Sequence, residues 1–497
     1  MAAVHPEPIN HLALTLSQRL DLLKSSATSI SSATADAASA VAATTTTARD
    51  FNDLPDDVLL HILGYLPSTK EAIQASLISR RWRNLWLHLP NLLFPKTNNL
   101  KTGTEKTLRA SATFIHRALA LRSPHPPQIQ KFYIQYQSSY DYPLPSSIER
   151  MRDMESWVYY AIHHDVQELD LDLSAFRYCY YHFYSGIFML TRIKCLTSLR
   201  LQGFRFSGLD VSDLLSCCEN LESFSLGDIY ELSSRDSVIK IHSLKLKKLN
   251  LGFYCNRTQS LEIDCPNLTS LVMTHFVVRE VHFKDVSSLD SATVYFWHQY
   301  YEQWESVVKS LVHHVKHLGT RNWGLQAPSK HGLLESLVCN LKHLEIRTGY
   351  SKFEVLDLAS FLQLFPNLES LVLESPSDDF RNKRHYRVPD YRYPQLEASE
   401  WKAILEQPIH LQLPSLKLVK IKDFRQTTQE VIFLSYLLLH GHALEKIVLD
   451  RPEEKGNFTV QPIVLRRKPK KMRVKDGDMK KFELSVRNSE IIIFVRN

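Results

Sequence analysis

The chain has 497 residues, 44% hydrophobic and 23% charged, a composition typical of a soluble protein with several domain-sized units. Segment 466–481, with nine basic and two acidic residues, already accounts for the formal charge of +7, so the balanced remainder excludes a domain-wide surface for nucleic acid. No apolar run approaches the roughly 20 residues of a membrane span, and we expect no membrane partner.

The first 49 residues are biased toward alanine, serine and threonine. Such a segment buries too little apolar surface to offset the entropy lost on ordering. Residues 1–49 are therefore predicted to be a disordered arm, with a short amphipathic helix near residues 12–23 as an alternative. The arm is also poor in acidic residues, as organelle transit peptides are, but it lacks their arginines.

Three short helices are predicted between residues 50 and 95. Pro55 marks the start of the first helix, where its missing N–H costs nothing, and Pro67 follows its end. The third helix places Trp82 and Trp86 four residues apart on one face. So small a unit cannot hide this many large apolar side chains, so a protein partner is expected to cover some of them. The alternative is a helical cap that packs only onto the following domain.

The order of leucine, proline and tryptophan residues in segment 50–95, with its ending S-R-R-W-R-N-L-W, resembles the plant-type F-box. By that resemblance, the segment binds an adaptor of the Skp family, which is tethered to a cullin in a ubiquitin ligase. The tryptophans are expected in the interface or in the core. The residues carried over as adaptor contacts are Leu54, Pro55, Leu59, Ile62, Leu63, Leu66, Pro67, Trp82 and Trp86.

Farther along the chain, an apolar residue, two variable residues, an apolar residue, one variable residue and an apolar residue recur as a unit, for example VQELDL at 166 and LKHLEI at 341. Most steps are near 25 residues, the period of leucine-rich repeats, in which each unit supplies a short strand and a return helix. We therefore predict an α/β fold, a three-helix F-box followed by a leucine-rich-repeat solenoid (a horseshoe), with repeats over residues 125–400. The units that contain Ala292 and Thr320 match least well, because these residues interrupt the apolar pattern.

Residues 401–450 resemble the FBD region that follows the repeats in plant F-box proteins. The resemblance departs from the family pattern at Arg425-Gln426, where a glycine-containing turn is usual, and at Leu413-Pro414, which replaces a Cys-Leu pair. Residues 451–497 are predicted to be a basic tail that ends in strand-like segments. Its segment 466–475 fits a nuclear localisation signal and a solvated linker equally well.

No catalytic motif is present in the sequence: the chain lacks a P-loop, a G-x-G-x-x-G pattern, a G-x-S-x-G elbow and an H-E-x-x-H helix. Seven cysteines without a C-x-x-C pair argue against a disulfide framework or a zinc knuckle and for reduced thiols, so we expect the nucleus and/or the cytoplasm as its location. His313 and His317 have no third metal ligand nearby in the sequence. We expect a non-catalytic subunit without cofactor or metal that brings a target close to enzymes on other subunits.

An unknown protein target is expected on the concave sheet face, where alternate strand residues point away from the core. The later strands place cations and an aromatic residue there, as hypothesised contacts for an acidic or phosphorylated segment: Tyr295, Arg321, Arg347, Lys420 and Lys422. A solvated polar face without a special role is the alternative. The insertion 375–395, rich in arginine and tyrosine, is equally compatible with target binding and with disorder.

Two functions of different class follow from the sequence. The first is a ligase adaptor, and the second is a leucine-rich-repeat interaction scaffold in which residues 50–95 are only a cap. The full ordered set from Leu54 to Trp86 favours the adaptor, because a cap has no need of it. A narrower third alternative is a repeat pocket that senses a small ligand jointly with the target, as in some plant relatives.

Overall fold

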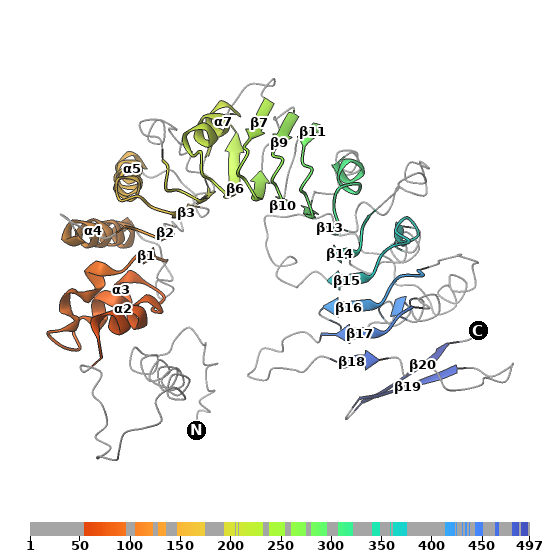
Figure 1. Ribbon diagram of the computed structural model, residues 1–497. Helices are drawn as coiled ribbons and strands as arrows, with labels where there is room; N and C mark the ends of the chain where they lie inside the picture. Colours follow the sequence, from red (N-terminus) through yellow and green to blue (C-terminus); the bar gives the residue numbers. More distant parts are fainter. Residues whose placement is uncertain are drawn as a thin grey trace, which may run out of the picture. The chain divides into compact units, whose positions relative to one another are not determined.

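The computed structural model divides into two compact units, residues 1–204 with 217–221 and residues 205–216 with 222–497. Within the described part of the chain, no helix combines the length and the apolar character needed to cross a bilayer. The structure describes the following residues (Figure 1): 54–95, 105–122, 128–135, 147–173, 193–203, 205–206, 208–231, 238–253, 260–274, 280–295, 307–321, 340–347, 358, 361–374, 413–422, 424, 430, 433–434, 437, 443–450, 463–466, 480–486 and 489–495.

Three short helices open the first unit: α2 (Asp56–Gly64), α3 (Thr69–Ala75) and the 3-10 helix η4 (Trp82–His88). Helix α2 begins directly after Pro55 and carries acidic residues in its first turn, where they complement the positive end of the helix dipole. Helix α3 is capped by Ser68, whose Oγ accepts a hydrogen bond from the Glu71 backbone N–H at 3.2 Å. These are the three helices that the sequence predicts.

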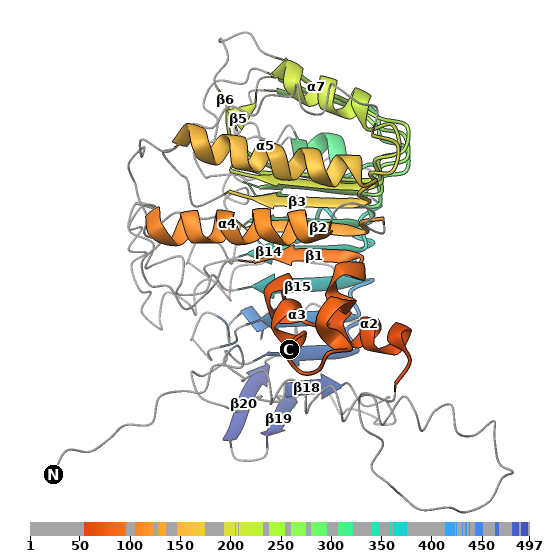
Figure 2. The same cartoon turned by 90° about the vertical axis from the view of Figure 1, so that its left-hand side faces the viewer.

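A parallel sheet follows the helices within the first unit. Its strands pair in chain order, and the helices α4 (Glu105–Arg122) and α5 (Ser147–His163) connect the first three of them and run alongside them (Figure 2). The buried apolar residues of the two helices, among them Ile115 and Trp157, belong to the core of this unit. The strands are β1 (Asn91–Phe94), β2 (Lys131–Gln135), β3 (Glu168–Asp172) and β4 (Ser198–Gln202).

The sheet begins earlier than the repeat pattern predicts. Strand β1 lies inside segment 50–95, which the sequence analysis assigns to the helical unit, and pairs in parallel with β2. The backbone N–H of Leu93 on β1 donates to the hydroxyl of Thr69 on α3 at 2.8 Å. A hydrogen bond from strand backbone to helix side chain therefore joins α3 to β1.

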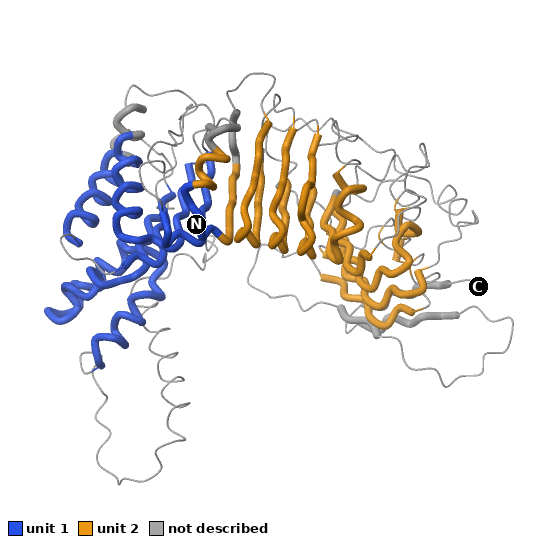
Figure 3. The backbone as a smooth tube through the Cα atoms, turned by 45° about the horizontal axis from the view of Figure 1, so that its top comes forward, with its two compact units in different colours: residues 1–204, 217–221 blue, residues 205–216, 222–497 orange. Residues whose placement is uncertain are grey.

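The second unit holds a longer run of parallel strands (Figure 3). Buried residues alternate with outward-facing ones along these strands, which is the pattern expected of repeats with a packed side and an open side. The strands are β6 (Ser223–Glu231), β8 (Lys248–Phe253), β10 (Ser270–Thr274), β12 (Ser291–Tyr295), β13 (His317–Arg321), β14 (His343–Arg347), β15 (Ser370–Glu374), β16 (Leu418–Lys422) and β17 (Lys446–Leu449).

The two weakest repeat matches form regular strands of this sheet. Ala292 on β12 and Thr320 on β13 are both fully buried, and the two strands pair in parallel in regular register. A short side chain or a threonine is thus accepted at these core positions. Smaller elements complete the unit: β5 (Arg205–Phe206), α7 (Gly208–Cys217), β18 (Ile463–Arg466) and the hairpin β19 (Lys480–Val486) with β20 (Ser489–Val495).

Three repeats of the second unit depart from the expected strand-and-helix plan. They return through strands that form a separate parallel sheet: β7 (Val238–His242), β9 (Ser260–Asp264) and β11 (Glu280–Asp285). The prediction of a return helix is wrong for these repeats. The reason is their alternation of apolar and polar residues, as in VIKIH of β7, which has the period of a strand and not of a helix.

Candidate functional site

The first candidate surface lies on the N-terminal helices. Six of the nine residues that the sequence nominates as partner contacts are at most 6% exposed and fill the core of the helices: Leu59, Ile62, Leu63, Leu66, Trp82 and Trp86. The other three are accessible to solvent, since Leu54 is half-buried and Pro55 and Pro67 are exposed. Only these three can touch a partner without a rearrangement of the core.

The structure reveals exposed apolar side chains on the same helices that the sequence analysis did not nominate. Val58 is 40% exposed, Tyr65 62%, Leu77 86% and Ile78 46%. Val58 and Tyr65, the residue that follows the last turn of α2, are seven positions apart and so lie on one side of this helix. Helical spacing alone does not separate them from the core, because Ile62, four residues after Val58 and three before Tyr65, is only 6% exposed.

Polar contacts fix this exposed face. The Tyr65 hydroxyl lies 3.2 Å from Nε2 of His61, and the two rings meet edge to face at 4.9 Å between centroids. Arg81, before η4, donates from Nε and Nη2 to Oδ1 of Asp56 at 2.9 and 2.6 Å, which joins the starts of η4 and α2. The exposed apolar groups are thus presented on a preformed surface.

Arg122 connects the N-terminal helices to the first repeat. Its guanidinium is buried at the end of α4, and Nη1 donates to the Leu89 carbonyl, just past η4, at 2.7 Å. Burial lowers the pKa of Arg122, and the neighbouring Tyr160 of α5 opposes that shift. Its Nε and Nη2 are buried without a hydrogen-bond partner in the described structure, so the Leu89 carbonyl is the acceptor that holds this guanidinium beside the residue after η4.

The second candidate surface is the open face of strands β12 to β17. The strand register aligns Arg321, Arg347, Glu374 and Lys422 in one row across β13, β14, β15 and β16. Neighbouring strands lie about 4.8 Å apart, so long side chains in one row reach each other. The sequence predicts cations on this face, and the register also places carboxylates among them.

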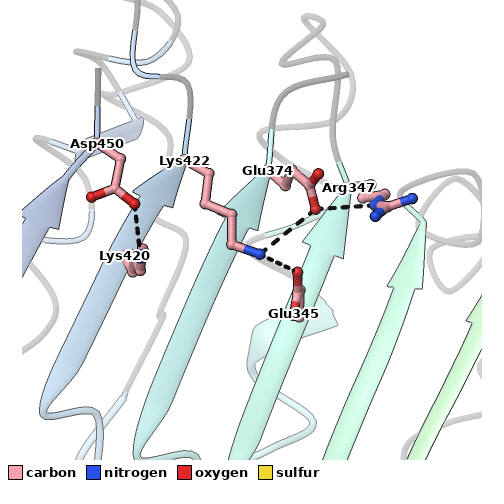
Figure 4. Close-up of polar contacts among 6 residues, drawn as sticks. All are labelled: Glu345, Arg347, Glu374, Lys420, Lys422 and Asp450. Carbon is pink, nitrogen blue, oxygen red and sulfur yellow. Dashed lines mark hydrogen bonds and ion pairs between the residues drawn. The ribbon is translucent and has the colours of Figure 1, made fainter. Parts of the chain in front are cut away.

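Ion pairs join these residues (Figure 4). Arg347 Nε donates to Glu374 Oε2 at 3.0 Å, and Lys422 Nζ lies 2.6 Å from Glu345 Oε1 and 3.8 Å from Glu374 Oε2. Lys420, two residues before Lys422 on β16, pairs through Nζ with Oδ2 of Asp450, just past the end of β17, at 2.8 Å. Three cations face three carboxylates, so this group of six residues is neutral at pH 7.

Tyr295 belongs to the same face. The guanidinium carbon of Arg347 lies 4.4 Å from the centroid of its ring, a cation–π arrangement. Burial raises the pKa of Tyr295, and nearby Glu345 and Glu374 raise it further, whereas Arg347 lowers it. Tyr295 is therefore a neutral phenol, and the face of its ring packs against the guanidinium of Arg347.

Two known protein families match this sequence. The F-box-like profile matches residues 51–89. The profile described as At1g61320/AtMIF1, LRR domain, matches residues 178–476, more than half of the chain. The chain belongs to this leucine-rich-repeat family.

Relatives in Arabidopsis thaliana carry the same domain names. The putative F-box/FBD/LRR-repeat protein At4g03220 is 27% identical over 462 residues, covering 80% of this chain and 88% of the relative. FBD-associated F-box protein At4g10400 is 26% identical over 383 residues, covering 71% of this chain and 86% of the relative. The prediction of a plant-type F-box/LRR protein with an FBD-like region is confirmed.

For this F-box/LRR protein, the structure brings most of the predicted target-binding residues together. Tyr295, Arg347 and Lys422 share one cluster, and Lys420 lies beside it with its own carboxylate partner. The backbone of Arg321 pairs with that of Arg347, and its side chain lies outside the described residues. The acidic partners Glu345, Glu374 and Asp450 were not predicted, and an incoming acidic segment has to compete with them.

The remaining predicted features of the F-box/LRR protein belong to its termini, to one insertion and to the histidine pair. The arm 1–49, the insertion 375–395 and most of the basic segment 466–475 lie outside the described residues. His313 is described and exposed. Among the described residues, no group of three or more histidine, cysteine, aspartate or glutamate side chains has the arrangement of a metal site.

Proposed function

We propose that this F-box/LRR protein is the substrate-recruiting subunit of a Skp–cullin–F-box ubiquitin ligase. Its F-box would bind a Skp-family adaptor, and its repeats would bind the protein to be ubiquitinated. The chain would contribute binding and orientation, while other subunits transfer ubiquitin. The nucleus and/or the cytoplasm is the proposed place of action, in line with the reduced thiols expected from the sequence.

The observation that carries this proposal is the exposed apolar set Val58, Tyr65, Leu77 and Ile78 above a filled core. Large apolar side chains that remain exposed on a small helical unit mark a surface for a protein partner. Leu54, Pro55 and Pro67 are the residues of the F-box motif itself that are accessible to solvent. Direct contact with the adaptor is therefore proposed for these seven residues, with the buried leucines and tryptophans as their support.

A second candidate function is the interaction scaffold without a ligase role. The observation in its favour is the contact of the helices with the first repeat, through Thr69 to Leu93 and Arg122 to Leu89, since a cap needs such contacts. A cap, however, has no use for a side chain as exposed as Leu77. Adaptor binding separates the two functions.

The deciding experiment is a pull-down of the full chain with a purified Skp-family adaptor. Leu77→Asp, and separately the double variant Leu54→Ala with Pro55→Ala, should weaken binding by at least about tenfold, because a charge or a lost contact enters an apolar interface. Leu121→Asp is the matched control, since Leu121 on α4 is 65% exposed and belongs to the same unit. No adaptor binding by the unaltered chain would leave the scaffold as the function.

A further inference from the structure

A groove of about 360 Å³ lies at the edge of the second unit's sheet where strands β14 to β17 begin. Its polar lining consists of Lys342, Asn367, Glu369, Ser415 and Lys417, and the small apolar residues Pro414 and Ala443 complete it. These residues precede the strands and are separate from the cluster around Arg347. Neither the F-box nor the open sheet face uses them.

The backbone around the groove is fixed by the sheet ladder. Lys342 N–H donates to the Lys316 carbonyl at 2.9 Å, Glu369 N–H to that of Lys342 at 2.8 Å, and Lys417 N–H to that of Glu369 at 2.9 Å. Because these amides are already bonded, a ligand in the groove meets side chains. The strand spacing sets the Cα atoms of Lys342 and Lys417 roughly 10 Å apart, with Glu369 between them.

The groove is lined by two positively charged lysines and one negatively charged glutamate. Glu369 Oε1 lies 2.9 Å from Lys342 Nζ, and Glu369 Oε2 lies 3.4 Å from Lys417 Nζ. One carboxylate thus serves two ammonium groups, and the hydrogen bonds from Lys342 and then Lys417 lower the pKa of Glu369. About half of each lysine side chain is exposed, so an incoming ligand can reach both.

In other ion pairs on the same edge, each carboxylate pairs with one lysine. Lys247 Nζ pairs with Glu222 at 2.9 Å, and Lys316 Nζ pairs with Asp290 at 3.0 Å. Among the described residues that precede the strands of this unit, two lysines share one carboxylate at the groove. This excess positive charge coincides with the hollow in the surface.

We propose that this edge groove, defined by Lys342, Glu369 and Lys417, binds a phosphate group. Each ammonium has three N–H donors, of which Glu369 occupies one, so several donors per lysine remain. The Ser415 hydroxyl lines the same hollow and adds a neutral donor. A phosphate monoester carries roughly −1.5 to −2 charges at pH 7, so it competes with Glu369 better than a single carboxylate does.

The test is calorimetric titration of the full chain at low ionic strength with O-phosphoserine and with inorganic phosphate. Lys342→Ala combined with Lys417→Ala should remove binding. Glu369→Gln should strengthen binding roughly three- to tenfold, because it removes the competing charge and leaves both lysines. Lys247→Ala, on a one-to-one pair of the same edge, should leave the affinity unchanged.

The Glu369→Gln variant is the decisive one, because a groove with only a structural role would gain no affinity from it. Unchanged or weaker binding in that variant overturns the proposal, as does equal loss in Lys247→Ala. Tighter binding of O-phosphoserine than of phosphate identifies a polypeptide-borne group as the source, and the reverse order identifies the free ion. Either order supports the site, which stands independently of adaptor binding by the F-box.

Discussion

The F-box and the open sheet face of the second unit differ in the chemistry of their exposed side chains. On the F-box, large apolar side chains such as Leu77 and Tyr65 remain exposed while the core beneath them is filled. On the sheet face, Arg347, Lys420 and Lys422 are exposed in part, and each has a carboxylate partner. The first surface lacks a partner for its apolar groups, whereas the second already satisfies its charges internally.

This difference determines which interactions can stabilise a complex at each surface. Apolar area on the F-box gains from any complementary apolar partner, with little dependence on salt. The sheet face gains only if a ligand replaces its internal ion pairs with better ones, and exposed ion pairs are worth little and are screened by salt. We therefore expect adaptor binding at the F-box to be the tighter of the two interactions, and target binding at the sheet face to be the more selective one.

The largest expected effect separates core from surface within the F-box. Trp82→Ala should lower the free energy of unfolding by about 3–5 kcal/mol, because Trp82 is almost fully buried. Leu77→Ala should change it by no more than about 0.5 kcal/mol, because Leu77 is 86% exposed. Chemical denaturation followed by circular dichroism measures both, and equal losses would contradict the division into core and partner surface.

The next effect concerns the contact that orients the F-box on the first repeat. Arg122→Ala should cost about 1–3 kcal/mol, because it leaves the Leu89 carbonyl without its donor in a buried site. Arg117→Ala is the matched control, since Arg117 is exposed on the same helix. Hydrogen exchange of η4 amides should rise in the first variant alone, and unchanged protection would show that η4 is held by other contacts.

A smaller effect is expected on the sheet face. Glu374→Gln removes the carboxylate between Arg347 and Lys422, and stability should change by no more than about 1 kcal/mol because the pairs are partly exposed. Binding of an acidic peptide should increase, with a steeper dependence on salt. Fluorescence anisotropy at two salt concentrations measures this, with Glu222→Gln as control. If acidic peptides bind no better, the cations do not form a target site.

The smallest effect is a pH dependence in the first unit. Burial is the main cause that raises the pKa of Asp170 above its ordinary value of 3.8, and its Oδ1 is buried without a hydrogen-bond partner in the described structure. A raised folded-state pKa means that Asp170 favours folding when protonated, and that this contribution is lost as pH rises through the folded pKa. Asp170→Asn should therefore raise Tm slightly at neutral pH and have less effect in acid. Thermal scans across pH check the sign.

Local sequence patterns were sufficient for the three N-terminal helices and for most strands. Pro55 and Pro67 bound α2, and the repeated apolar spacing located even the strands that contain Ala292 and Thr320. Strand β1 escaped prediction because it directly follows a helix and precedes the recognisable repeats. The sheet of β7, β9 and β11 escaped because the family plan suggested helices where a short alternating pattern stood.

The candidate sites were predicted less completely, because they depend on contacts between distant residues. Lys422 meets Glu345 across 77 positions of sequence, and only the strand register brings them together. The F-box pattern likewise shows which residues are apolar, but not which of them the unit itself covers. Leu59 and Leu63 proved to be core, whereas Val58, adjacent in sequence, is exposed.

Strand β1 has a consequence for how such chains can be recombined. A chimera that exchanges the F-box by cutting after η4 would keep β1 paired with β2 but would remove Thr69, whose hydroxyl accepts the hydrogen bond from the Leu93 N–H of β1. A cut beyond Phe94 would carry β1 along with its Thr69 contact, but would pair a foreign strand with the native β2. The exchangeable module is therefore the F-box with β1 and a compatible first repeat, and shuffling of adaptor and target specificities is expected to succeed only at that boundary.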